Sequence, residues 1–340
     1  MPAAVTVVLP TRDRRTLLER SLGTVLDQTG VDLAVLVVDD GSNDDTAEWA
    51  ASVDDSRVNV VTHATSLGVA AARNTGIERA ATPWIAFLDD DDLWAPTKLA
   101  EQLAALEATP AARWACVGQV TLDEHLRLVE SAAPPAGSGG VLEPLLMLNA
   151  VPGGGSGVLA ATELVRELGG FDPRLSLLAD WDLWIRLAAK APAAIVDRPL
   201  LGYVRHSANM SWDVSRIGHE FAILDVKHAE LRADLGVRRD SELWSSWIAE
   251  AERRSGNRWR AIGADLRRAR RARTPRPLLR AAVTAVSPRA WIELHNRRTA
   301  RGIDPGWRAE AERWLAPIRA RSPAHVWDPT RRERHSRCGC

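Results

Sequence analysis

Residues 84–94 read "WIAFLDDDDLW", an apolar run that ends in four consecutive aspartates. The run is typical of a strand that is buried on both faces. Four adjacent carboxylates repel one another, so their presence at a strand end requires an explanation. An aspartate that caps a helix beginning near Pro96 accounts for one of them, Asp91 or Asp92. A divalent cation such as Mg²⁺ or Mn²⁺, which favours carboxylate oxygens, accounts for the cluster.

Three similar runs precede this one and predict a layered α/β sheet. They read "VTVVL" (5–9), "LAVLVVDD" (33–40) and "RVNVVTH" (57–63), and helical patterns separate them. The alternation of strands and helices predicts right-handed βαβ units with parallel strands. Ligands bind outside the carboxyl ends of such strands. The polar residues that follow the strands should therefore gather on one rim: Thr11 to Asp13, Asp39 and Asp40, and Asp89 to Asp92.

The second acidic strand end, "VVDDGSNDDT" (37–46), allows two interpretations. Asp40, Gly41 and Ser42 can form a turn, with Asp44 or Asp45 capping the next helix. Alternatively, a carboxylate at a strand end can accept hydrogen bonds from a nucleotide base or a ribose. The stretch by itself does not separate the two.

The middle of the chain predicts loops, a helix and closing strands. Residues 133–140 and 151–157 are glycine-rich and predict flexible or tightly turned loops. In "ADWDLWIRLAAK" (179–190), Asp180 opens a helix as its N-cap, and a carboxylate beside a cleft is also well placed as a general base. Two closing strands are predicted at 193–197 and 200–206.

Composition limits the class of protein. The 340 residues suffice for one large domain or two of ordinary size, and 46% of them are hydrophobic. No apolar run is long enough to predict a membrane span, and residues 1–15 lack the pattern of a signal peptide. The cysteines at 116, 338 and 340 favour neither a disulfide framework nor a zinc site. We therefore expect a cytoplasmic protein.

Six motifs occur in an order that resembles the family-2 glycosyltransferases, over roughly residues 4–211. They are "VTVVLPTRDR", "LVVDDGSNDDT", "LGVAAARNTGI", "WIAFLDDDDLWAPTKL", "GGFDP" with "ADWDLWIRLA", and "YVRHSANMS". The resemblance implies an α/β fold, a GT-A-type nucleotide-binding sandwich with a mostly parallel central sheet. It also implies an inverting, metal-dependent, hexosyltransferase-like enzyme. Such an enzyme moves one sugar from a nucleotide-sugar donor (UDP-, dTDP- or GDP-linked) to an acceptor hydroxyl, in cell-envelope polysaccharide or other glycoconjugate biosynthesis.

The resemblance also assigns roles by position. Asp180 would be the catalytic base. The donor would be bound by Pro10, Thr11 and Arg12 around the nucleotide base, Asp40 on that base, Arg73 near the base or diphosphate, and Asp89 and Asp90 at the diphosphate and the ribose or sugar. Mn²⁺ or Mg²⁺ would be held by Asp91 and Asp89, with His206 as a further ligand. Asp92 would remain as the helix cap.

The chain departs from the family pattern at two places. Arg12-Asp13 stands where the family often has Tyr-Asn, so a guanidinium would replace the aromatic ring that stacks on the base. Ala179 replaces the usual Glu before the catalytic base, which leaves a catalytically silent nucleotide-sugar-binding or scaffold protein as an alternative. A nucleotidyltransferase is a second alternative, but "PTRDRR" (10–15) lacks the glycine-rich phosphate loop expected of one.

Charge divides the chain in two. Residues 1–210 contain 16 Lys and Arg against 28 Asp and Glu, whereas residues 211–340 contain 28 against 16. Between residues 253 and 301 there are 15 arginines, which form either solvated helix faces or a surface that docks on anionic lipid beside a lipid-linked acceptor. No nucleic-acid-binding motif accompanies them. We expect a catalytic domain at 1–212, an arginine-rich, mostly helical region at 213–325 and a disordered tail at 326–340, with the protein peripheral to the inner face of the plasma membrane.

Overall fold

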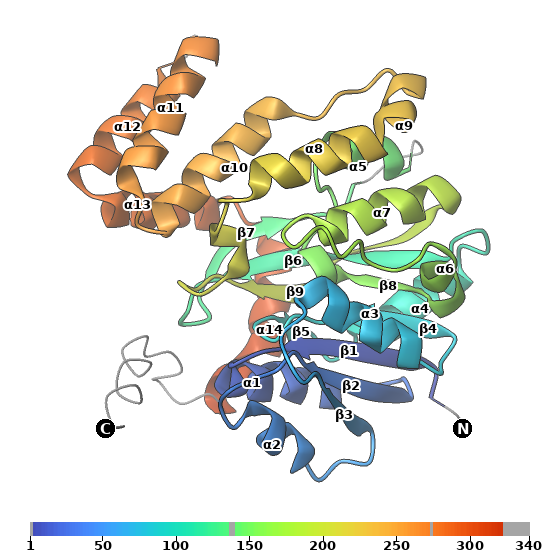
Figure 1. Ribbon diagram of the computed structural model, residues 1–340. Coiled ribbons are helices and arrows are strands. Elements are labelled where there is room, and N and C mark those ends of the chain that lie inside the picture. The colour runs from blue at the N-terminus through green and yellow to red at the C-terminus, as the bar shows by residue number, and fades with distance from the viewer. Residues whose placement is uncertain (1–2, 136–139, 273–274, 322–340) are drawn as a thin grey trace.

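A mixed β-sheet lies at the centre of the molecule. The computed structural model describes residues 3–135, 140–272 and 275–321 (Figure 1). The sheet has nine strands in the order β3-β2-β1-β4-β8-β6-β9-β5, and β7 pairs with β6. The tail predicted at 326–340 and residues 136–139 of the first glycine-rich loop lie outside the described residues.

The first half of the sheet is parallel, as the sequence predicts. Its four strands pair in parallel through backbone hydrogen bonds, and three helices connect them. The strands are β1 (Val5–Thr11), β2 (Leu33–Asp39), β3 (Val58–Thr62) and β4 (Trp84–Phe87), and the helices are α1 (Arg15–Leu26), α2 (Thr46–Ala51) and α3 (Val69–Arg79). The carboxyl ends of these strands therefore share one edge of the sheet.

The second half of the sheet is mixed. Strand β8 (Val158–Ala161) runs antiparallel between β4 and β6 (Trp114–Leu122), and β6 is parallel to β9 (Ala193–Val204). The short strands β5 (Leu93–Trp94) and β7 (Leu128–Ala132) are antiparallel to β9 and β6. The expected α/β sandwich followed by helices is thus confirmed, with a sheet that is parallel on one side and mixed on the other. The two closing strands predicted at 193–206 are wrong as separate elements, because β9 continues past a register shift opposite Gly118.

Helices cover both faces of the sheet, and alternation along β1 shows how. Val7 packs into a core shared with α1 and α4 (Lys98–Glu107), whereas Val8 packs into a core shared with α3 and α7 (Ala179–Lys190). Successive side chains of a strand point to opposite faces, so a strand buried on both faces is apolar throughout. This is why the strand runs in the sequence lack alternation.

The C-terminal part of the chain is helical. Beyond the short 3-10 helix η2 (Met210–Trp212) it forms α8 (Ile217–Lys227), α9 (Ala229–Asp234), α10 (Ser241–Arg254), α11 (Arg258–Ala272), α12 (Arg276–Val286), α13 (Pro288–Arg301) and α14 (Pro305–Arg321). Figure 1 shows α11 and α12 side by side at the upper edge of the molecule, away from the strands. Among the residues with described positions, no helix has the length and apolarity needed to cross a bilayer.

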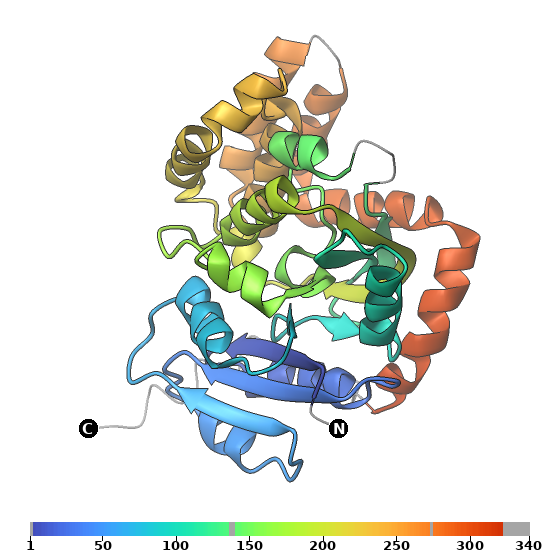
Figure 2. The same cartoon turned by 90° about the vertical axis from the view of Figure 1, so that its right-hand side faces the viewer.

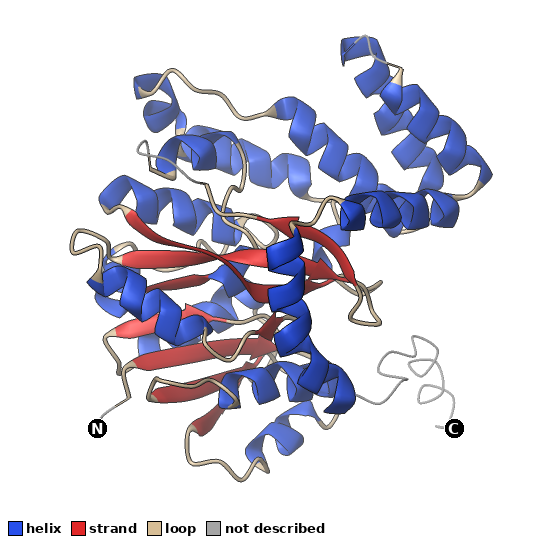
Figure 3. Ribbon diagram, turned by 180° about the vertical axis from the view of Figure 1, so that it is seen from behind, coloured by secondary structure: helices blue, strands red, loops and turns tan. Residues whose placement is uncertain are grey.

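Helix α14 returns from this helical region to the sheet. Trp314 is 7% exposed, and its indole N–H donates to the carbonyl of Pro199 in β9 (3.0 Å). A Cβ at Gly118 would lie 2.2 Å from the ring of Trp307, so only glycine leaves room for that indole. Figures 2 and 3 show α14 running across the strands on one face of the sheet. The last described helix is therefore part of the sheet's core.

Candidate active site

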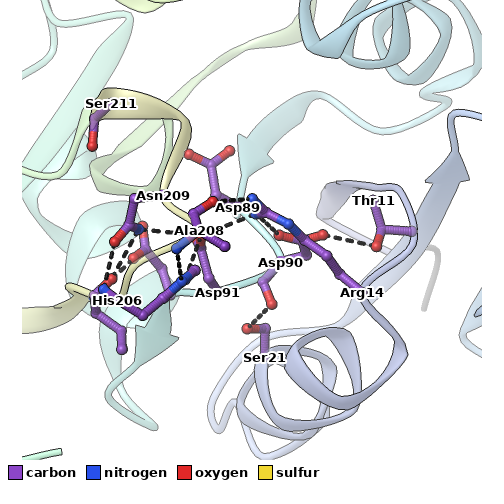
Figure 4. Close-up of polar contacts among 12 residues, drawn as sticks. Thr11, Arg14, Ser21, Asp89, Asp90, Asp91, His206, Ala208, Asn209 and Ser211 are labelled. Carbon is purple, nitrogen blue, oxygen red and sulfur yellow. Dashed lines mark hydrogen bonds and ion pairs between the residues drawn. The ribbon is translucent and has the colours of Figure 1, made fainter. Parts of the chain in front are cut away.

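The turn after β1 positions Arg14, whose guanidinium points toward the rim formed by the carboxyl ends of the strands. Asp13 adopts a positive φ of 52°, which Asp and Asn adopt more readily than other residues with a side chain. Its carboxylate accepts a hydrogen bond from the backbone N–H of Asn43 (2.7 Å), and its own N–H donates to Ser42 (2.9 Å). Arg14 follows directly, and its guanidinium reaches the acidic strand end (Figure 4).

The four aspartates after β4 separate into different environments. Asp90 accepts hydrogen bonds from the Thr11 hydroxyl (2.8 Å) and from Arg14 (3.0 Å). Asp91 accepts from the same guanidinium (3.1 Å), and its Oδ2 lies 3.0 Å from Nε2 of His206 (Figure 4). Asp89, the most exposed of the four, pairs with Arg73.

Asp92 links the segment after β4 to two distant segments by hydrogen bonds and does not cap a helix. Its carboxylate accepts from the Ser156 hydroxyl (2.6 Å) and from the backbone N–H of Val204 (3.2 Å). The residue before α4 is Thr97, and no side chain caps that helix. The predicted capping role is therefore wrong, because the chain between Asp92 and Lys98 forms β5 before the helix begins.

Burial and local charge set the protonation of the acidic group. Burial raises the pKa of Asp90 to about 6, although the charge of Arg14 lowers it. Burial raises the pKa of Asp92 well above its usual value, and the charges of Asp91 and Asp89 raise it further. Burial alone would raise the pKa of Asp91, but the hydrogen bond from His206 and the charge of Arg14 bring it below the usual value. Of the buried members, Asp91 is therefore the one whose surroundings favour the ionised form.

Arg14 is a site residue that the sequence analysis did not identify. It is the cation shared by Asp90 and Asp91, and its other terminal nitrogen donates to the carbonyl of Ala208 (2.6 Å). It thereby joins the end of β4 to the loop after β9. The basic stretch "PTRDRR" beside an acidic quartet is the available signal, but its three arginines cannot be distinguished without the turn geometry.

A glycine loop separates Asp180 from the strand ends. A Cβ at Gly154 would lie 2.9 Å from the Asp180 carboxylate, and a Cβ at Gly155 would lie 2.8 Å from the guanidinium of Arg73. Gly154 also adopts a positive φ of 53°, which suits glycine. Ser156 fixes the loop by donating to Asp92. The tightly turned alternative for residues 151–157 is therefore the observed one.

Asp180 lies in the first turn of α7, one residue after the helix begins. Leu178 is the N-cap residue, so the predicted N-cap role of Asp180 is wrong. The capping carboxylate instead comes from Glu220 of α8, which accepts from the backbone N–H groups of Leu177 (3.0 Å) and Leu178 (2.9 Å). Asp180 accepts from the Asn149 amide (3.1 Å), and burial raises its pKa against the lowering effect of Arg73.

Asp40 holds its own neighbouring loop. Its two carboxylate oxygens accept from the Ser66 hydroxyl (2.7 Å) and from the N–H groups of Leu67 and Gly68 (2.8 Å each), and His63 Nδ1 lies 2.7 Å away. Burial would raise the pKa of Asp40, but these hydrogen bonds lower it. A carboxylate has about four acceptor positions, and all four are used here. Contact with a nucleotide base would therefore require one of these donors to move.

The remaining predicted donor-binding residues lie on the same rim but outside the acidic group. Pro10 is buried within β1. The side chain of Arg12 is half exposed and lies 3.5 Å from the carboxylate of Asp13, so its guanidinium faces solvent. The structure thus brings together Thr11, Arg73, Asp89, Asp90, Asp91 and His206.

The donor atoms fit part of a metal site. Asp91 offers a carboxylate oxygen, which suits Mn²⁺ or Mg²⁺ together with substrate oxygens, and His206 offers an imidazole nitrogen, which suits the transition metal Mn²⁺ better than Mg²⁺. Asp89 is turned to Arg73, and among the described residues no group of three His, Cys, Asp or Glu side chains is arranged to hold a metal ion. A cation at Asp91 therefore depends on ligands from a substrate and on withdrawal of Arg14.

Comparison with known proteins gives consistent matches. Residues 6–129 match the family model described as glycosyl transferase family 2. The UDP-Glc:alpha-D-GlcNAc-diphosphoundecaprenol beta-1,3-glucosyltransferase WfgD of Escherichia coli is 35% identical over 102 residues, covering 30% of this chain and 40% of that protein. The putative teichuronic acid biosynthesis glycosyltransferase TuaG of Bacillus subtilis (strain 168) is 38% identical over 101 residues, 29% of this chain and 40% of the relative.

A solved structure supports the fold. The crystal structure of S. aureus TarS 1-349 superposes with a TM-score of 0.51 at 17% sequence identity, covering 74% of this chain and 71% of that one. The chain spans less than half the length of the two curated relatives it matches.

Proposed function

This chain carries a domain of glycosyltransferase family 2, and we propose that it transfers one hexose from a nucleotide sugar to a hydroxyl group of a lipid-linked polysaccharide precursor, with inversion at the anomeric carbon. The observation that carries the proposal is the glycine loop at 153–157, with Asp180 against Gly154 and Arg73 against Gly155. One short loop therefore separates a carboxylate base from the cation that faces the strand ends. An acceptor hydroxyl and a leaving diphosphate need such groups on opposite sides of the sugar.

Asp180 acts in this proposal as the general base. It removes the proton from the acceptor hydroxyl as that oxygen attacks the anomeric carbon, and the bond to the diphosphate breaks. Burial raises the pKa of Asp180, which strengthens it as a base, and the charge of Arg73 acts in the opposite direction by favouring the ionised form. Arg73 is held by its ion pair with Asp89 and by the ring of Phe171, whose centre lies 5.1 Å from the guanidinium carbon. It stabilises the negative charge that develops on the diphosphate.

Asp91 and His206 would hold the divalent cation in this proposal. Mn²⁺ or Mg²⁺ would supply positive charge to the leaving diphosphate. Thr11 and Asp90 line the adjacent rim, where a ribose hydroxyl would approach. Arg12, exposed at the end of β1, supplies a planar cation for stacking on the nucleotide base.

The names of the relatives support the choice of donor and acceptor. The Escherichia coli relative is named for UDP-glucose and for a diphosphoundecaprenol-linked acceptor, and the Bacillus subtilis relative for teichuronic acid biosynthesis. We therefore choose a UDP-hexose as the first donor to test. A panel of UDP-, dTDP- and GDP-sugars, read by thermal shift with and without Mn²⁺, would identify the nucleotide.

The test measures donor binding and donor turnover in the same variants. Asp180→Asn should keep the affinity for the UDP-hexose within about twofold while transfer and donor hydrolysis fall by about 10²-fold or more. Asp197→Asn, at an exposed aspartate of β9, provides the matched control. Turnover by Asp180→Asn equal to that of the parent would remove Asp180 as base. Donor binding without any turnover by the parent protein would support the catalytically silent alternative.

A further inference from the structure

Helix α12 exposes an apolar face that no part of the described chain covers. Leu278, Leu279 and Val286 are 50%, 64% and 86% exposed, and Ala282 lies between them on the same face. Their spacing of three, four and eight residues places them along one side of a helix. The opposite side, with Pro277, Ala281 and Thr284, is buried against the rest of the helical region. The helix is therefore apolar on the side that meets solvent.

Helix α11, which packs beside α12, also exposes apolar side chains and adds positive charge. Trp259 is 69% exposed and Leu266 is 42% exposed, seven residues apart on one face. The same two helices carry five exposed arginines: Arg258, Arg260, Arg267, Arg270 and Arg276. We call the exposed apolar residues of α11 and α12 with these arginines the hairpin patch.

Some of the C-terminal arginines form ion pairs inside the helical region, so they do not contribute to the positive charge of the exposed surface. Buried Asp265 of α11 pairs with Arg253 of α10 (2.7 Å), and Arg268 of α11 pairs with Glu242 of α10 (2.7 Å), so these guanidinium groups hold α10 and α11 together. Around the hairpin patch the situation differs. No carboxylate of the described residues lies within 4 Å of Arg267, Arg270 or Arg276. Within the patch Arg260 lies 3.9 Å from Glu252, so the positive charge without a nearby carboxylate comes from Arg267, Arg270 and Arg276.

We propose that the hairpin patch docks on an anionic membrane surface. A helix face with apolar side chains and flanking arginines inserts at the boundary of headgroups and acyl chains, and each basic residue near an anionic surface contributes about 1 kcal/mol. A second copy of the chain would bring like charges together at the same face. Nucleic acid would leave the leucines and valine in water. Anionic lipid satisfies both the charge and the apolar side chains.

The position of the patch suits the active site. Arg260 of α11 lines an open cleft of about 440 Å³ together with Glu252, Ser255 and Asn257, and its other wall is the loop at 207–215. The Ser255 hydroxyl donates to the carbonyl of Trp212 (2.7 Å), and the Trp212 indole donates to the carbonyl of His206 (2.8 Å). Docking would thus place the lipid surface next to the loop that carries His206. The delivery of a lipid-linked acceptor by this route rests on the proposed function, whereas docking itself does not.

The test is flotation of the full chain with vesicles of defined composition. Phosphatidylcholine vesicles with about 30% phosphatidylglycerol should retain the protein at low salt, and pure phosphatidylcholine vesicles should not. The double variant Leu279→Ser/Val286→Ser should reduce binding by roughly tenfold or more, since two exposed apolar side chains no longer insert. Val226→Ser provides the matched control, because Val226 of α8 is 81% exposed outside the hairpin patch.

The outcomes separate docking from catalysis. Hydrolysis of the UDP-hexose in the absence of lipid should be the same in the parent and the double variant, since neither substituted residue lies in the active site. Equal binding to both vesicle types, no binding at low salt, or unchanged binding of the double variant would overturn the docking proposal. Concentration-dependent self-association that the double variant abolishes, without vesicle binding, would also overturn it. Donor turnover alone decides the proposed function.

Discussion

Lys98 gives a prediction whose size follows from its surroundings. Its side chain is fully buried, its ammonium nitrogen lies 3.9 Å from the centre of the Trp94 ring, and Gln102 accepts its one hydrogen bond (2.8 Å). No carboxylate of the described residues lies within 4 Å of it. Burial lowers the pKa of Lys98 well below its usual value, although neighbouring Cys116 raises it. We expect the folded protein to hold this amine in its neutral form.

The sign and the magnitude follow from proton uptake on unfolding. The unfolded chain binds a proton that the folded chain does not, so the free energy of unfolding rises with pH until the ordinary lysine pKa near 10.5. One proton corresponds to at most about 1.4 kcal/mol per pH unit, or at most about 2.7 kcal/mol between pH 7 and pH 9. Lys98→Met removes the titrating group but keeps the apolar stem. The lost hydrogen bond to Gln102 costs about 1 kcal/mol at every pH.

The assay is urea unfolding followed by tryptophan fluorescence at pH 7, 8 and 9. The stability of Lys98→Met relative to the parent should fall from pH 7 to pH 9, by up to about 2.7 kcal/mol. Other titrating groups, including Cys116, occur in both proteins and largely cancel in this difference. Lys190→Met makes the same substitution at an exposed lysine. A difference between Lys98→Met and the parent that does not change with pH would refute a neutral Lys98.

Three further predictions address the site and the fold. Gly154→Ala should reduce transfer by about tenfold or more without loss of fold, because the new Cβ would lie 2.9 Å from the Asp180 carboxylate. Gly23→Ala in α1 is the control, since a Cβ there has no atom within 4 Å. Circular dichroism and activity are measured for both variants. Arg14→Met should lower the free energy of unfolding by roughly 3–5 kcal/mol, because Asp90 and Asp91 lose the cation between them. MnCl₂ should raise the melting temperature of this variant more than that of the parent. An equal rise in both proteins would contradict competition between Arg14 and a metal. Trp314→Ala should cost about 3–5 kcal/mol in urea unfolding, and a cost below about 1 kcal/mol would contradict the packing of α14 on the sheet.

Local patterns in the sequence predict the sheet and its polar rim. The apolar runs at 5–9, 33–40, 57–63 and 84–90 correspond to β1, β2, β3 and β4. Burial on both faces explains the apolar sequences of β1 and β4, whereas β3 lies at the edge of the sheet and is only partly buried. Parallel pairing then brings Thr11 and the aspartates after β4 together. The roles of these residues in donor binding and catalysis stay predictions.

What the sequence does not show depends on contacts between distant residues. Arg14 and Ala208 are 194 positions apart, and Asp92 and Val204 are 112 positions apart. No local pattern tells which arginine in 12–15 reaches the aspartates, or that Asp92 ties two loops together. Glu220 caps the start of α7 from another helix for the same reason. Helix caps and ion pairs formed across the fold need the fold to be known first.

The packing of α14 has a consequence for synthesis of the chain. Trp314 and Leu315 complete the same core as Val5 and Val7, about 310 residues earlier. At roughly 5–20 residues per second, the ribosome needs roughly 15–60 s after β1 to synthesise the residues up to α14. During this interval one face of the nascent sheet exposes apolar side chains to the cell interior. Chaperone occupancy of the nascent chain should therefore persist until the last described helix has emerged.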